Sequence, residues 1–85
     1  MNLKSEATQG YNAGNKPDAV NPFIWSSASW LAFEAGRLLW QRGATAPYKA
    51  KIGRGYSINI ESNGGNLFVF KFQGKDLTPT MERKG

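Results

Sequence analysis

The 85-residue sequence contains no cysteine and no histidine. Disulfide bonds, thiol nucleophiles and zinc ligation by sulfur or imidazole are therefore excluded, and so is the usual general base near neutral pH. Acidic residues are also scarce, because only 6 are scattered along the chain, and no H-E-x-x-H, P-loop or G-x-S-x-G motif occurs. We therefore expect a protein that is not an enzyme and that has no metal site and no cofactor.

The sequence also lacks long apolar runs. No stretch approaches the roughly 18 consecutive apolar residues of a membrane span, and the opening M-N-L-K-S-E-A-T-Q-G lacks the apolar core of a secretory signal. Together with the lack of cysteine, these absences predict a soluble, cytoplasmic protein without a membrane partner. The short length predicts a single small domain over residues 1–85, with flexible ends at 1–4 and 77–85.

Positive charge is what the chain has in excess. The formal net charge is +5, and 9 of the 11 basic residues follow residue 36. The segment from Arg37 to Arg54 contains no acidic residue. Such a basic half favours a polyanion or an acidic protein surface as the partner, although basic residues also simply keep small domains soluble. The candidate nucleic-acid-binding residues are Arg37, Arg42, Lys49, Lys51, Arg54 and Lys71.

The N-terminal half has the pattern of a helical pair. A short helix is expected from Ser5 as its N-cap to a left-handed C-cap at Gly14. The proline-rich segment that follows, N-K-P-D-A-V-N-P-F-I-W, reads as an ordered connector. Its apolar residues are expected to fold back, at least in part, onto the core; they are Val20, Phe23, Ile24 and Trp25.

The main helix is expected at about residues 27–42, with Ser26 or Ser27 as the N-cap and Gly43 as the stop. Its polar residues form one narrow stripe, so the helix should be covered on more than one side. Gly36 in its interior costs about 1 kcal/mol relative to alanine. Its presence predicts that another backbone or a large ring approaches the helix closely at that point.

After residue 46 the periodicity changes from helical to alternating. Strands are expected at 48–52, 56–61 and 67–72, separated by G-R-G and S-N-G-G-N turns, and the tail from Gln73 is expected to be irregular. The fold class is therefore α+β, with the two helices packed on a two- or three-stranded antiparallel sheet. Phe68, Phe70 and Phe72 share one strand face. They could stack nucleic acid bases if exposed, but the thin core favours their burial against the main helix.

Four short motifs resemble those of the ribosome modulation factor family: G-Y-N-A-G at 10–14, N-P-F at 21–23, W-L at 30–31 and G-R at 36–37. The resemblance covers residues 10–43, and the segment from residue 44 has no counterpart in that family. It implies two helices pressed together through small residues. It also implies binding to the ribosome, with basic residues contacting ribosomal RNA and helping to hold the ribosome inactive. Similar short helix pairs occur in small phage and plasmid proteins of unassigned activity, so the resemblance is also compatible with a phage-encoded relative or with a shared helical hairpin alone.

Two functions therefore stand as expectations. In the first, a small binding protein docks on RNA or the ribosome through its basic face. In the alternative, a protein-binding inhibitor or modulator, for example one encoded by a phage, covers an acidic surface of a host enzyme or defence complex. Trp25 and Trp40 add a further expectation, because they lie near opposite ends of an unusually apolar helix. Either the connector buries them, or they contribute to a homodimer contact.

Overall fold

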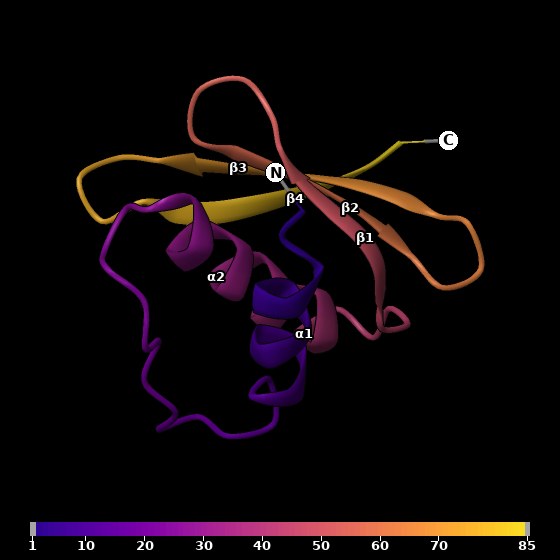
Figure 1. Ribbon diagram of the computed structural model, residues 1–85, viewed down its shortest axis with the longest axis horizontal. Helices are drawn as coiled ribbons and strands as arrows, with labels where there is room; N and C mark the ends of the chain where they lie inside the picture. The colour runs from indigo at the N-terminus through magenta and orange to yellow at the C-terminus, as the bar shows by residue number, and fades with distance from the viewer. Residues whose placement is uncertain (1, 85) are drawn as a thin grey trace.

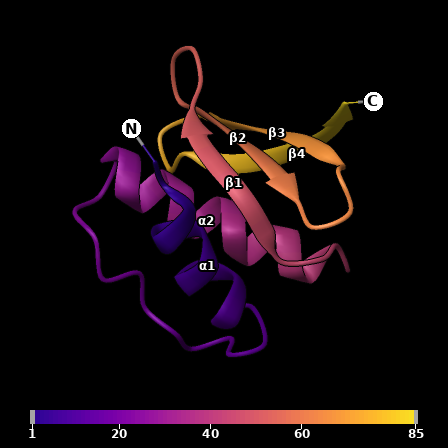
Figure 2. The same cartoon turned by 45° about the vertical axis from the view of Figure 1, so that its right-hand side comes forward.

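Two helices pack on one face of a four-stranded antiparallel sheet in the computed structural model, which describes residues 2–84 (Figure 1). The strands pair in chain order, so the sheet is a simple meander with β1 and β4 at its edges. The opposite face of the sheet carries no helix (Figure 2). The elements are α1 (Lys4–Asn12), α2 (Ala28–Gln41), β1 (Pro47–Ile52), β2 (Ser57–Ser62), β3 (Leu67–Gln73) and β4 (Thr78–Lys84).

The core lies between the helices and the inner face of the sheet. Phe68, Phe70 and Phe72 point inward from β3 and are buried, which confirms that these rings belong to the core. Ile58 and Ile60 lie beside them on β2, as the alternation predicts. The helices contribute buried side chains to this cluster, namely Ala7, Leu31, Ala32, Ala35 and Leu39, and Leu3 adds another from just before α1.

The two helices meet at a reciprocal glycine contact. A Cβ atom at Gly36 would overlap the carbonyl oxygen of Ala7, and one at Gly10 would overlap the carbonyl oxygen of Phe33. In glycine, a hydrogen on Cα occupies the position of the Cβ atom. At Gly10 and Gly36 this hydrogen points at the neighbouring carbonyl oxygen, as in a weak Cα–H···O contact. The close backbone approach predicted from Gly36 is therefore confirmed, and Gly10 supplies the matching position on α1.

The capping residues predicted for α2 are confirmed, whereas those predicted for α1 are wrong. Ser27 caps α2 by accepting a hydrogen bond from the Trp30 amide at 3.1 Å, and Gly43 follows the helix with a φ of +79°. In α1, Ser5 lies inside the helix, and Asn2 Oδ1 accepts from the Lys4 amide at 2.9 Å. Gly14 has no left-handed conformation; a Cβ there would lie 2.6 Å from the Cβ of Trp40. This glycine therefore serves packing and not capping.

The tail predicted to be irregular forms β4. It pairs with β3 from Gln73↔Thr78 to Leu67↔Lys84, after a turn in which Gly74 has a φ of +81°. The sequence T-P-T-M-E-R-K has little strand propensity of its own, so the β3 edge supplies the backbone partners that order it. The prediction of an irregular tail was wrong. The flexibility expected at Met1 and Gly85 lies outside the described residues.

Residues 13–27, here called the connector, loop around the side of the helices that faces away from the sheet (Figures 1 and 2). Polar groups hold this loop in place. Asn21 Nδ2 donates to the Trp30 carbonyl at 3.0 Å and to Glu34 Oε2 at 2.9 Å. Arg37 Nη2 donates to the Ala19 carbonyl at 2.7 Å. The N-P-F motif thus begins with the residue that fastens the connector to α2.

The apolar residues of the connector mostly point outward. Phe23 packs edge-on to Phe33, with ring centroids 6.1 Å apart, and so follows the expectation. Val20 and Ile24 are 84% and 83% exposed, and Trp25 remains 56% exposed although it touches Trp30. Several of these residues were expected on the core, but the polar contacts of Asn21 and Arg37 already anchor the loop. Its apolar side chains are left on the surface.

Candidate nucleic-acid interface

The six predicted site residues do not form one continuous patch. Lys49 and Lys51 lie together on the outer face of β1, and Lys71 lies two strands away on β3. Arg54 lies in the turn between β1 and β2, and Arg42 follows the end of α2. Only the two β1 lysines therefore share a defined site, and the remaining residues are described below by their own surroundings.

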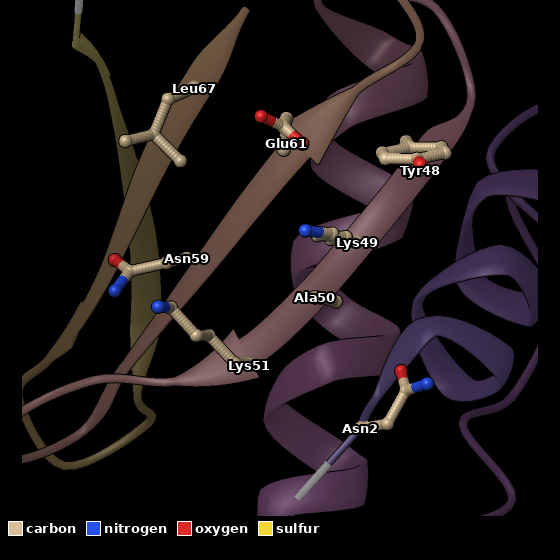
Figure 3. A pocket seen from close by; sticks show the side chains of 8 residues that line it. All are labelled: Asn2, Tyr48, Lys49, Ala50, Lys51, Asn59, Glu61 and Leu67. Carbon is tan, nitrogen blue, oxygen red and sulfur yellow. The ribbon is translucent and has the colours of Figure 1, made fainter. Parts of the chain in front are cut away.

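An open groove of about 720 Å³ runs along the outer face of β1 and β2 (Figure 3). Lys51 extends from β1 across β2 toward Asn59, with Tyr48 at the other end of β1 and Asn2 beyond the strand edge. We call this hollow the β1 groove. It is lined by Asn2, Tyr48, Lys49, Ala50, Lys51, Asn59, Glu61 and Leu67.

The N-terminal segment completes one wall of the β1 groove. The Leu3 amide donates to the Ala50 carbonyl at 2.9 Å, and the Leu3 side chain is fully buried. This anchor holds the neighbours of Leu3, Asn2 and Lys4, beside the edge of β1. The sequence reasoning missed both residues, because it expected a flexible segment at 1–4. The available signal was Leu3, an isolated apolar residue just before a helix.

Tyr48 owes its position to an irregularity in β1. The register with β2 shifts between Pro47 and Lys49, so Tyr48 lies at a bulge, where a strand re-aims one side chain. Tyr48 as a whole residue is 51% exposed. The ammonium groups of Lys4 and Lys49 lie 5.8 and 5.9 Å from the ring centroid. Among residues 2–84, no other aromatic ring has two cations this near.

The charges across the β1 groove are incompletely balanced. Lys49 is in register with Glu61, and Lys51 is in register with the neutral Asn59. Neither lysine forms an ion pair with any residue in the described part of the chain. With Lys4 at the rim, three cations face one carboxylate around the groove. The groove is therefore a site of net positive charge.

Lys71 has a different environment on the same face. Its ammonium lies 3.5 Å from Glu82 Oε2, and that oxygen lies 3.8 Å from the ammonium of Lys84. All three side chains are about half exposed, so these pairs are screened by water and add little to stability. They do lower the charge that Lys71 presents to a polyanion.

Two arginines line a second, smaller hollow of about 320 Å³ beside the end of α2. One is Arg42, a predicted site residue, and the other is Arg83 on β4, which donates to Asn66 Oδ1 at 2.7 Å. Because β4 was not predicted, Arg83 was not a candidate. Arg54 lies elsewhere, exposed between Gly53 and Gly55 in the turn that joins β1 to β2.

Arg37 is occupied by an internal contact. Besides bonding Ala19, its guanidinium carbon lies 5.2 Å from the centroid of the Phe33 ring, and its Nε is buried without a hydrogen-bond partner among the described residues. The side chain is only partly exposed. Arg37 therefore positions the connector, and its charge is directed away from the β1 groove.

No group of acidic side chains within residues 2–84 has the arrangement of a metal site. Of the helices that the structure describes, none combines the length and the apolar character needed to cross a membrane.

Comparisons with protein-family models, with curated proteins and with solved structures find no match to this chain.

Proposed function

We propose that this protein is a non-enzymatic binding protein that docks on RNA through the β1 groove. The observation that carries the proposal is the pair Lys49 and Lys51, which point outward on one strand without ion pairs in the described part of the chain. Lys4 adds a third cation at the rim. Such a row of cations attracts the phosphate groups of an RNA strand, and this electrostatic attraction supplies most of the affinity in nonspecific nucleic acid binding.

The ribosome is the proposed source of that RNA. The support is the resemblance of residues 10–43 to the ribosome modulation factor family, together with the glycine contact between α1 and α2. Gly10, which opens the G-Y-N-A-G motif, lies against Phe33, and Gly36, which opens G-R, lies against Ala7. Both glycines therefore have a structural reason to occur in a helix pair of this kind. Co-sedimentation with ribosomes on a sucrose gradient tests the target directly.

A salt series tests RNA binding. In the variant Lys49→Ala/Lys51→Ala, the slope of log affinity against log salt concentration should decrease in magnitude by about two. Each lost phosphate contact lowers the magnitude of that slope by about one. The matched control is Lys16→Ala/Lys75→Ala, which removes the same charge at exposed positions outside the groove. An affinity for RNA that does not respond to salt, or an equal loss in both variants, would remove the proposed site.

A second candidate function is supported by a different surface. Val20, Ile24 and Trp25 project from a connector that polar contacts fix in place, which is how a rigid loop presents apolar anchors to another protein. This surface faces away from the sheet, so it is separate from the β1 groove (Figure 2). The candidate is a protein-binding inhibitor or modulator. Its partner should be captured from lysate after nuclease treatment and at high salt, and Ile24→Ser/Trp25→Ser should abolish the capture.

A further inference from the structure

We propose that the β1 groove selects single-stranded over double-stranded nucleic acid, with Tyr48 as the platform on which an unpaired base stacks. This inference rests on the proposed RNA-binding function and adds the class of RNA that the groove accepts. The buried Phe68, Phe70 and Phe72 leave the inner face of the sheet unable to stack bases. Any stacking on the sheet must therefore come from a ring beside its outer face.

Tyr48 meets the geometric requirement. The bulge between Pro47 and Lys49 turns its ring toward the rim of the groove, and half of the side chain is exposed. Aromatic rings bind unpaired bases in a sequence-tolerant way, because every base has a flat face. The bases of a duplex are already stacked on each other, so they do not offer that face to a side chain.

The cations around Tyr48 are placed for the phosphates that flank a stacked base. Lys4 and Lys49 each have an ammonium within 6 Å of the ring centroid, at 5.8 and 5.9 Å. Lysine side chains are long and flexible, so either ammonium can leave the ring when a base arrives and contact the adjacent phosphate. Lys51 lies further along the same strand and extends the cationic track.

Polar groups along the groove match the edges of an unpaired base. The Asn59 amide offers donors and an acceptor, and Glu61 offers a carboxylate acceptor. Asn2 offers its Nδ2 donors, beside an Oδ1 that already accepts from the Lys4 amide. These groups lie on both sides of the cationic track, on the N-terminal segment and on β2. In a duplex, base pairing occupies the Watson–Crick edges, so such groups can contact those edges only on an unpaired base. The groove therefore combines a stacking ring, phosphate contacts and groups that can read an exposed base edge.

The test compares an oligouridine of about 12 nucleotides with an RNA duplex of the same length, using fluorescence anisotropy at low salt. We expect the parent protein to bind the single strand more tightly. Tyr48→Ala should weaken binding to the single strand about tenfold, while changing neither binding to the duplex nor the salt slope. Tyr48→Phe, the matched control, keeps the ring and should bind within about twofold of the parent. Circular dichroism verifies that each variant is folded.

The outcomes separate this inference from the function on which it rests. Equal binding to both RNAs, or full affinity in Tyr48→Ala, would overturn the single-strand preference while leaving RNA binding in place. Binding to neither RNA would overturn the proposed function and this inference with it. Equal losses in Tyr48→Ala and Tyr48→Phe would show that the hydroxyl and not the ring carries the affinity, and would overturn the stacking role.

Discussion

Single glycines determine how closely the two helices can approach. The backbone conformation at positions 10 and 36 does not require glycine, since neither Gly10 nor Gly36 has a positive φ. Their role is to admit the carbonyl oxygens of Phe33 and Ala7, where any Cβ would overlap backbone atoms. Backbone cannot rotate away as a side chain can, so the helices themselves would have to separate. A glycine in a helix interior is thus explained by its neighbour and not by its own dihedral angles.

This contact leads to a prediction for alanine variants. Gly36→Ala should improve helix propensity by about 1 kcal/mol and yet lower the free energy of unfolding by about 1–3 kcal/mol through overpacking. Gly10→Ala should do the same, and chemical denaturation of both variants measures it. The double variant should lose less than the sum of the single losses, because separating the helices relieves both overlaps. Stability equal to the parent in either single variant would contradict the close approach.

Arg37 shows why residue type alone did not identify the site. Its place among the cations from Arg37 to Arg54 made it a candidate, but the connector returns over α2 and uses the guanidinium to hold Ala19. Lys49 and Lys51 were predictable as neighbours, because alternate residues of a strand share a face. Asn2 and Lys4 were not, because only the burial of Leu3 brings them to β1.

At the scale of helices and strands, the sequence correctly predicted the features that depend on residues close together in the chain. The cap at Ser27, the stop at Gly43 and the alternation in β2 and β3 are short-range features, and the structure confirms them. β4 depends on a long-range feature, namely the hydrogen-bonding edge of β3. The composition of its own residues gave no sign of it, since Pro79 and the charged end are typical of loops.

The packing of β4 can be tested by two neighbouring residues. Met81 packs partly against the core, whereas the side chain of its neighbour Thr80 is exposed. Met81→Asp should therefore lower the thermal midpoint. The free energy of unfolding should fall by about 1–3 kcal/mol, because the new charge lies against apolar neighbours. Thr80→Asp makes the same change of charge at an exposed position and should alter stability by less than about 0.5 kcal/mol. An equal, small effect of both would mean that β4 does not pack on the helices.

At the scale of the whole molecule, the β1 groove and the connector lie on opposite sides of the protein. The outer face of the sheet carries the β1 groove, and the connector carries the exposed apolar residues beyond the helices (Figure 1). Of the two fates expected for Trp25, burial under the connector does not occur, because the residue is 56% exposed. We therefore propose a contact with another protein chain as the role of this side.

We expect the connector to support weak self-association. The sedimentation coefficient of the parent should rise with concentration in the micromolar range, because Val20, Ile24 and Trp25 are all exposed on the connector. Ile24→Ser/Trp25→Ser should remain monomeric under the same conditions, and Lys49→Ala/Lys51→Ala should behave as the parent does. A parent that is monomeric at every concentration would contradict self-association and leave the connector available to a different protein.

The chain-order pairing of β1, β2, β3 and β4 also has a consequence for folding kinetics. Each hairpin closes a short loop, so the sheet can extend strand by strand at little entropic expense. The bond from Leu3 to Ala50 instead joins opposite halves of the chain and must close a much longer loop. We therefore expect it to form late, after the hairpins and the helix pair. Since that bond brings Asn2 and Lys4 to β1, we expect the β1 groove to be the last surface of the protein to form during folding.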